Sequence, residues 1–96
     1  MSFWNLFQRE KTTTEAENYE RLRKTGRVTD GKVIDSDGAN VDEITQIFYI
    51  YSVSGADYES SHFLTAEQRT RQSEYAPGAN VSIRYDPHQP SNSVVV

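Results

Sequence analysis

The stretch YAPGANVSIRYDP, residues 75–87, contains a turn, a strand and a strand terminator. Pro77 and Gly78 predict the turn, because proline presets φ at the first central position of a β-turn and glycine permits a positive φ at the second. Polar residues then alternate with three apolar residues of a half-buried strand: Val81, Ile83 and Tyr85. Pro87 has no backbone donor and ends the strand, and Pro90 continues the break.

The strongest strand before this stretch is predicted for residues 44–53. Four of its side chains form one apolar face: Ile47, Tyr49, Tyr51 and Val53. Phe48 and Ile50 lie on the opposite face, so the centre of the strand is apolar on both sides. Two interpretations follow: the strand is central and covered on both faces, or Phe48 and Ile50 form an exposed apolar patch. A tight hairpin at residues 54–57 leads into a return strand over residues 58–64.

The remaining segments complete a β-structure. A first strand is predicted over residues 27–35, with Gly31 as a candidate bulge, and residues 35–43 form a polar loop. Residues 65–74 are polar and hold a single helical turn, for which Thr65 and Gln68 fit a capping box. Residues 94–96 form a short closing strand. About five strands predict a mainly β fold, a small five-stranded antiparallel barrel or curved sheet, since closing the sheet removes exposed edges.

One α-helix precedes the strands. Thr14 as N-cap and Glu17 three residues later fit a capping box, and Gly26 is a natural stop. The apolar face of this helix is thin, consisting of Ala16, Tyr19 and Leu22, so the helix must lean on the body or on a partner. The predicted organisation is therefore an aromatic N-terminal segment (1–13), a helix (14–25) and a small β-barrel domain (26–96).

Taken together, these pieces resemble a bacterial family known as a domain of unknown function (number thirty-five ninety-two). The resemblance covers roughly residues 26–96. It rests on Gly31-Lys32-Val33, on Ile47 to Val53 with Gly55 and Tyr58, and on Tyr75, Pro77-Gly78, Val81, Ile83, Tyr85-Asp86-Pro87, Pro90 and Ser93. It implies a small β-domain, frequently tethered to transmembrane helices in other members, with no assigned activity and no catalytic residues to carry over.

Composition narrows the function classes. The 96 residues allow one domain, and the absence of cysteine excludes disulfides and thiolate chemistry and suits a reducing cytoplasm. Residues 1–32 carry seven basic and five acidic groups (+2), and residues 33–96 carry three basic and nine acidic groups (−6), which sum to the net charge of −4. An acidic body argues against broad nucleic-acid binding, which needs cations at the phosphates. No apolar run is long enough to span a membrane, and no secretory signal is predicted.

The N-terminal segment carries a candidate contact of its own. If it is helical, Phe3, Trp4 and Phe7 share a face with Leu6 at its border. Such a segment can anchor a chain at a membrane surface, assisted by the basic cluster Arg21, Arg23, Lys24 and Arg27. The alternative is a segment that packs on its own domain or frays.

No catalytic or metal constellation emerges. The acidic loop at residues 35–43 does not have the spacing of an EF-hand and is better explained as a solvated loop. His62 and His88 lie on different elements, so a site formed with Asp86 would need a chance convergence. The serines and glycines match neither a nucleophile elbow nor a phosphate loop. We therefore expect no enzyme activity, no cofactor and no metal.

The function predicted from sequence is a non-enzymatic interaction module of a bacterial cytoplasm, held peripherally at the inner membrane by Phe3, Trp4, Leu6 and Phe7 or free of it. An unknown protein partner would bind through Phe48, Ile50 or a strand edge. The alternative is an oligonucleotide-binding small barrel with a stacking platform of Tyr49, Tyr51, Tyr58, Tyr75 and Tyr85. The acidic neighbours of these tyrosines favour core or rim positions for them instead. A small hydrolase or metal enzyme lacks any supporting constellation.

Overall fold

The structure, a computed structural model, describes residues 16–40 and 43–96. Residues 16–25 are helical. Five strands follow: β1 (Arg27–Asn40), β2 (Glu43–Val53), β3 (Ala56–Phe63), β4 (Asn80–Asp86) and β5 (Gln89–Val95). Two short 3₁₀ turns, η1 (Gln68–Thr70) and η2 (Gln72–Tyr75), connect β3 to β4. The predicted mainly β fold with five antiparallel strands and an N-terminal helix is confirmed.

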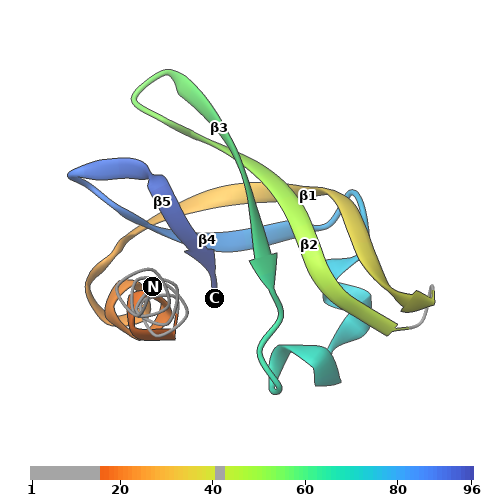
Figure 1. Ribbon diagram of the computed structural model, residues 1–96. Helices are drawn as coiled ribbons and strands as arrows, with labels where there is room; N and C mark the ends of the chain where they lie inside the picture. The colour runs from red at the N-terminus through yellow and green to blue at the C-terminus, as the bar shows by residue number, and fades with distance from the viewer. Residues whose placement is uncertain (1–15, 41–42) are drawn as a thin grey trace, which may run out of the picture.

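The strands form one strongly curved sheet in the order β3-β2-β1-β4-β5 (Figure 1). β1 pairs with β2 through residues 31–40 and with β4 through residues 27–32, so it belongs to both halves of the sheet. Three consecutive strands and a fourth that returns beside the first make a Greek key. Because every hydrogen-bonded pair is antiparallel, β3 and β5 run parallel across the remaining opening. This strand order is that of the OB-fold, a five-stranded, partly open barrel.

The register shift nearest to Gly31 in β1 lies at Ile34 and not at Gly31 itself, which corrects the sequence prediction. Gly31 pairs regularly with Tyr51 and with Val81, and the register shifts between Val33 and Asp35. The glycine is needed for close approach: a Cβ there would lie 2.8 Å from Cγ1 of Ile83 and 2.9 Å from the carbonyl oxygen of Ile50. Local sequence cannot reveal such a contact between strands.

Two further boundaries differ from prediction. The expected polar loop at residues 35–43 is mostly strand, because β1 continues to Asn40, which pairs with Glu43. Its turn-forming residues remain in the ladder; Asp35 and Asp37 accept hydrogen bonds from the backbone of Ser36 and Gly38. The closing strand begins at Gln89 rather than at residue 94, so Pro90 does not continue the break. Proline is tolerated there because β5 is an edge strand.

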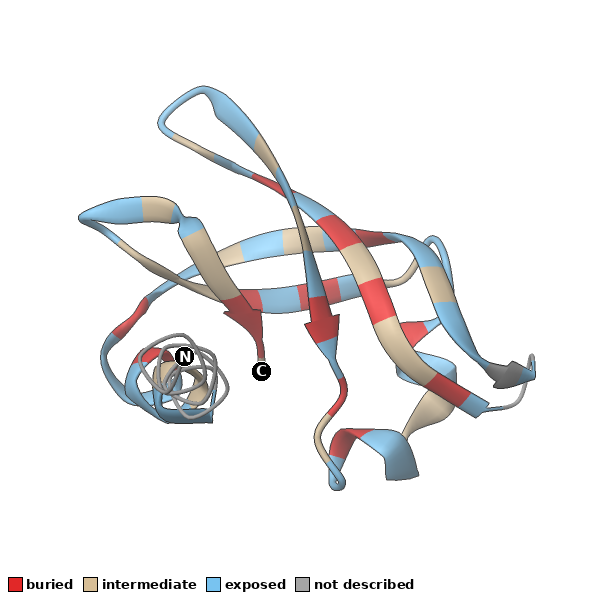
Figure 2. Cartoon of the chain, viewed as in Figure 1, coloured by how far each residue is buried: buried red, intermediate tan, exposed pale blue. Residues whose placement is uncertain are grey.

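The core lies inside the curved sheet, where buried and exposed residues alternate along the strands (Figure 2). Its buried members include Val33, Ile47, Tyr49, Tyr51, Tyr75, Val81, Ile83 and Val95, with Tyr58 and Tyr85 packed against them. Tyrosine hydroxyls tie β2 to β5: Tyr49 Oη lies 2.7 Å from Ser93 Oγ, and Tyr51 Oη donates to the carbonyl of Pro90 at 2.6 Å. The tyrosines are thus core or rim residues, as predicted.

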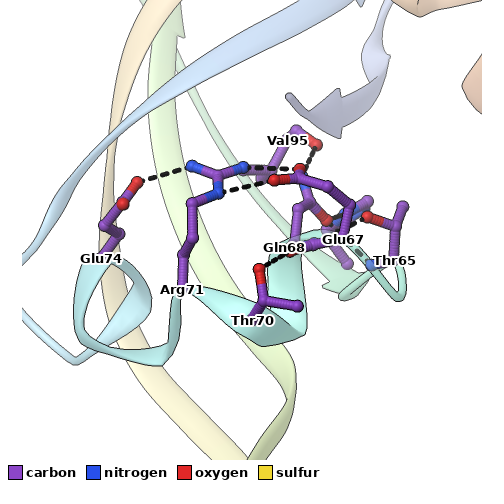
Figure 3. Close-up of polar contacts among 8 residues, drawn as sticks. Thr65, Glu67, Gln68, Thr70, Arg71, Glu74 and Val95 are labelled. Atoms are coloured by element: carbon purple, nitrogen blue, oxygen red, sulfur yellow. Dashed lines mark hydrogen bonds and ion pairs between the residues drawn. The ribbon is translucent and has the colours of Figure 1, made fainter.

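The seam between β3 and β5 is closed by a side chain. Gln68 is almost fully buried, and its Nε2 donates to the carbonyl oxygen of Val95 at 2.8 Å (Figure 3). Its Oε1 accepts from the backbone N–H of Thr65 at 2.9 Å, while the Gln68 N–H donates to Thr65 Oγ1 at 3.1 Å. The predicted Thr65–Gln68 capping box is therefore present. It fixes the amide that links the end of β3 to the end of β5.

His62 completes this closure. Its Nε2 lies 2.9 Å from Gln68 Oε1, and because a carbonyl oxygen only accepts, Nε2 carries the proton. The imidazole stacks on Tyr19 of the helix, with ring centroids 5.7 Å apart. Leu22, one helical turn further on, is 0% exposed, and Asn18 and Asn92 exchange hydrogen bonds between the helix and β5. The helix leans on the body, as its thin apolar face predicted.

We expect the burial of His62 to make folding stability fall below neutral pH. Burial lowers the pKa of His62, the hydrogen bond to Gln68 only partly opposing this, whereas the unfolded chain titrates near 6.5. Stability is therefore full above about pH 6.5. Below it, the unfolded state binds the proton first, and the free energy of unfolding falls by up to about 1.4 kcal/mol per pH unit until the folded pKa is reached.

Urea unfolding between pH 5 and pH 7.5, with an NMR titration of the imidazoles, measures this effect. His62→Gln should remove the histidine part of the pH slope, whereas His88→Gln, at an exposed position in the β4–β5 turn, should retain it. An imidazole of His62 that titrates at or above 6.5, or an unchanged slope in His62→Gln, would contradict the expectation.

Candidate functional site

The outer face of β2 is open. Along this strand Ile47, Tyr49 and Tyr51 are buried, while Phe48 is half-buried and Ile50 is 42% exposed. β2 has hydrogen-bonded neighbours on both edges, but no element among the described residues covers the outward face of Ile50. Of the two interpretations of this strand, the exposed apolar patch is the one that the structure adopts.

Neighbouring strands enlarge this patch. Ile34, which follows the buried Val33 on β1 and so faces outward, is 41% exposed, and Phe63 at the end of β3 is 67% exposed. Phe48 lies opposite Asp35 on β1, next to the bulged Ile34, and opposite Ser61 on β3, which places Phe63 diagonally beside it. We call Ile34, Phe48, Ile50 and Phe63 the outer patch. A hollow of about 460 Å³ lies in it, lined by Ile34, Phe48 and their polar neighbours on β1 and β3.

The surroundings of the outer patch are acidic. β2 and β3 contain three carboxylates, Glu43, Asp57 and Glu59, and neither strand contains lysine or arginine. Lys32, opposite Ile50 on β1, is the cation nearest in register. Two arginines of the helix form ion pairs away from the outer patch: Arg23 with Glu20 at 2.9 Å and Arg21 with Asp86 at 3.6 Å. The outer patch therefore favours apolar and basic ligands over anions.

A second concave feature borders the outer patch. The seam cleft, of about 570 Å³, lies between the helix and the ends of β3 and β5. Tyr19, His62 and Phe63 contribute its aromatic walls, and Ser61, Ser93 and Val94 line the strand side. Phe63 belongs to both features, so the outer patch and the seam cleft meet at this side chain.

The remaining candidate residues are four N-terminal residues and two histidines, and the two histidines do not come together. Phe3, Trp4, Leu6 and Phe7 lie outside the described residues. His62 is buried in the seam, whereas His88 is exposed and its backbone N–H is bonded to Asp86 Oδ1 at 2.8 Å. Among residues 16–40 and 43–96, no group of three histidine or carboxylate side chains is placed to hold a metal ion. No helix in this described part is long and apolar enough to cross a membrane.

Sequence reasoning identified Phe48 and Ile50 but missed their two neighbours. The exposure of Phe63 could have been predicted, because alternation along β3 places its side chain on the same outward face as Asp57, Glu59 and Ser61. The outward orientation of Ile34 could also have been predicted, because it follows the inward-facing Val33, but its place beside Phe48 depends on the register of β1 against β2.

Comparison with known proteins identifies the family of the chain from its sequence. No curated protein and no solved structure matches it. A family model described as "Domain of unknown function (DUF3592)" matches residues 24–96, which include all five strands. The resemblance drawn from the strand and turn motifs is thereby confirmed, and the chain belongs to the DUF3592 family.

Proposed function

We propose that this chain is a non-enzymatic interaction module that binds a protein partner through the outer patch. The observation that carries the proposal is the exposure of Ile34, Ile50 and Phe63 around Phe48 on one uncovered sheet face. Contiguous exposed apolar surface of this kind marks binding sites, because its burial against a partner is favourable. The carboxylates of β2 and β3 define the partner further, as a surface with an apolar centre and a basic rim.

The polar groups near the outer patch have structural partners, which supports a binding rather than a catalytic role. The His62 imidazole is bonded to Gln68, and the hydroxyl of Ser52 donates to the carboxylate of Asp57. Ser52 pairs a hydroxyl with a carboxylate, but no further described residue orients that carboxylate, and the His62 imidazole is bonded to an amide. The described residues therefore lack the nucleophile, base and orienting group that covalent catalysis requires. Binding through shape and charge is the function that such a surface can perform.

The competing function is oligonucleotide binding, and one observation favours it: the strand order is that of the OB-fold, which often binds nucleic acid on the face of strands 2 and 3. Phe48 and Phe63 are aromatic residues on that face. Fold alone does not define function, however, and a groove for single strands needs cations along the backbone path. β2 and β3 supply carboxylates there, so we favour a protein partner.

The proposal extends to location. We infer a cytoplasmic module, since a chain without cysteine suits a reducing compartment. The aromatic segment with Phe3, Trp4, Leu6 and Phe7 would hold it at the inner face of the membrane, with Lys24 and Arg27 able to face anionic lipid.

Photo-crosslinking tests the binding role of the outer patch. Benzoylphenylalanine at Phe48 or Phe63 in the 96-residue chain should give discrete protein adducts in the producing cells. The same label at Val28, which is 59% exposed but lies away from the outer patch on β1, should not. With the partner purified, Ile50→Asp should weaken binding by about tenfold or more, because a buried apolar contact is lost. Val28→Asp should leave the affinity within about twofold.

Equal adducts at Val28, no adducts at any position, or adducts that nuclease treatment removes would each contradict the proposal. The last result would instead support the oligonucleotide-binding alternative.

Co-sedimentation with vesicles tests the location. The 96-residue chain should pellet with anionic phosphatidylglycerol vesicles at low salt and be released at high salt, because the attraction is partly electrostatic. Replacement of Phe3, Trp4, Leu6 and Phe7 by serine should leave the protein in the supernatant. Equal behaviour of the two proteins would refute the membrane anchor without affecting the binding role of the outer patch.

A further inference from the structure

The turn between β2 and β3 determines where the backbone of β3 points. Ser54 and Gly55 both have positive φ, 51° and 85°, as in a two-residue type I′ hairpin turn. Val53 and Ala56 face each other across it and form a hydrogen-bonded pair. The alternation of an antiparallel ladder then directs the N–H and C=O groups of every even-numbered residue of β3 toward β2. The bond from Leu64 N–H to the carbonyl of Thr45, 2.9 Å, agrees with this parity.

The odd-numbered residues of β3 therefore present their backbone groups to the seam. These residues are Asp57, Glu59, Ser61 and Phe63. No strand among the described residues pairs with this edge, because β3 is the last strand of the sheet on its side. β3 and β5 approach each other at their C-terminal ends and separate toward their turns (Figure 1). The free edge is consequently most open over Asp57, Glu59 and Ser61.

The facing edge of β5 is partly occupied. Val96 N–H donates to the carbonyl of Ser82 at 3.0 Å, so Val94 and Val96 bond to β4 and the backbone groups of Val95 face the seam. The carbonyl of Val95 already accepts from Gln68. Gln68 thus blocks the closed end of the seam and leaves the edge of β3 as its accessible side.

Charge selects the occupant of this edge. Glu59 is exposed and has no ion pair or hydrogen bond within the described part of the chain, and Asp57 lies two residues away on the same outward face. Edge-to-edge pairing of two copies of β3 would bring these carboxylates together, which opposes self-association. A peptide with basic residues on its outward face would complement them instead.

We propose that the free edge of β3 binds an extended peptide of the partner as an added strand. The inward-facing side chains of the peptide would be apolar, and one of them would enter the seam cleft against Tyr19, His62 and Phe63. Its outward-facing side chains would be basic and lie beside Asp57 and Glu59. Strand addition gives affinity through main-chain hydrogen bonds and specificity through alternate side chains. The inference rests on the proposed function, because it requires a protein partner. It adds that this partner binds as an extended strand.

The probe is a fluorescein-labelled nonapeptide that alternates valine and lysine and has phenylalanine at its centre. Binding to the 96-residue chain is measured by fluorescence anisotropy. Ser61→Pro removes a backbone donor that faces the seam, while Ser61→Ala removes the same hydroxyl and keeps the donor. We expect Ser61→Pro to weaken binding by about tenfold or more, since at least one main-chain hydrogen bond is lost. Ser61→Ala should stay within about twofold of the original affinity.

N-methylation of the peptide gives an independent readout that does not depend on the folding of any variant. In an added strand, alternate peptide N–H groups face β3 and the others face away. N-methyl groups on one set of alternate residues should abolish binding, and N-methyl groups on the other set should have little effect.

Three results would overturn the inference: no binding of the peptide, equal binding by Ser61→Pro and Ser61→Ala, or equal effects of the two N-methylation patterns. Binding that is lost in Ile50→Asp but unchanged in Ser61→Pro would also refute strand addition while leaving the outer patch as the protein-binding surface. Failure of crosslinking at Phe48 and Phe63 refutes the proposed function separately.

Discussion

The amide of Gln68 is the interaction on which the closure of this barrel depends. Four antiparallel pairings hold the five strands in a row, and no ladder joins β3 to β5. Gln68 bridges that opening with bonds to Val95, Thr65 and His62, all of its buried polar atoms being satisfied. A buried polar group without a hydrogen-bond partner destabilises the fold by about 1–3 kcal/mol. If one of these bonds is missing, the closed barrel is therefore destabilised. The helix depends on the same junction, since Tyr19 stacks on the imidazole that Gln68 orients.

Closure by a side chain instead of a ladder also explains where binding surface remains. A fully paired barrel has no edges, whereas this one keeps the unpaired backbone of β3 beside a cleft of about 570 Å³. The outer patch lies on the strands that form this edge, and Phe63 connects the two features. Both proposals therefore place the partner on one continuous region of β2 and β3, with an acidic rim that distinguishes it from a nucleic-acid groove.

Much of the fold was predictable because its signals are local. The alternation of Val81, Ile83 and Tyr85 and the capping box of Thr65 and Gln68 are both readable from the sequence and both present. The rest depends on contacts between distant residues. Asp35 and Asp37 are residue types that favour turns, but pairing with β2 keeps them in β1. Gly31 has no room for a side chain because Ile83 of β4 lies too close. Of the outer patch, Phe48 and Ile50 followed from strand parity, while the proximity of Ile34 to Phe48 depends on the register between β1 and β2, which local sequence does not determine.

Amide hydrogen exchange along β3, followed residue by residue by NMR, tests the central claim most directly. If Gln68 closes the seam without a backbone ladder, protection should alternate. The amides of Tyr58, Ser60 and His62, which face β2, should exchange slowly, and those of Asp57, Glu59 and Ser61 should exchange at least about tenfold faster. Uniformly strong protection of all six amides would contradict this, because it would show that β3 is paired on both edges and has no free edge to offer a partner.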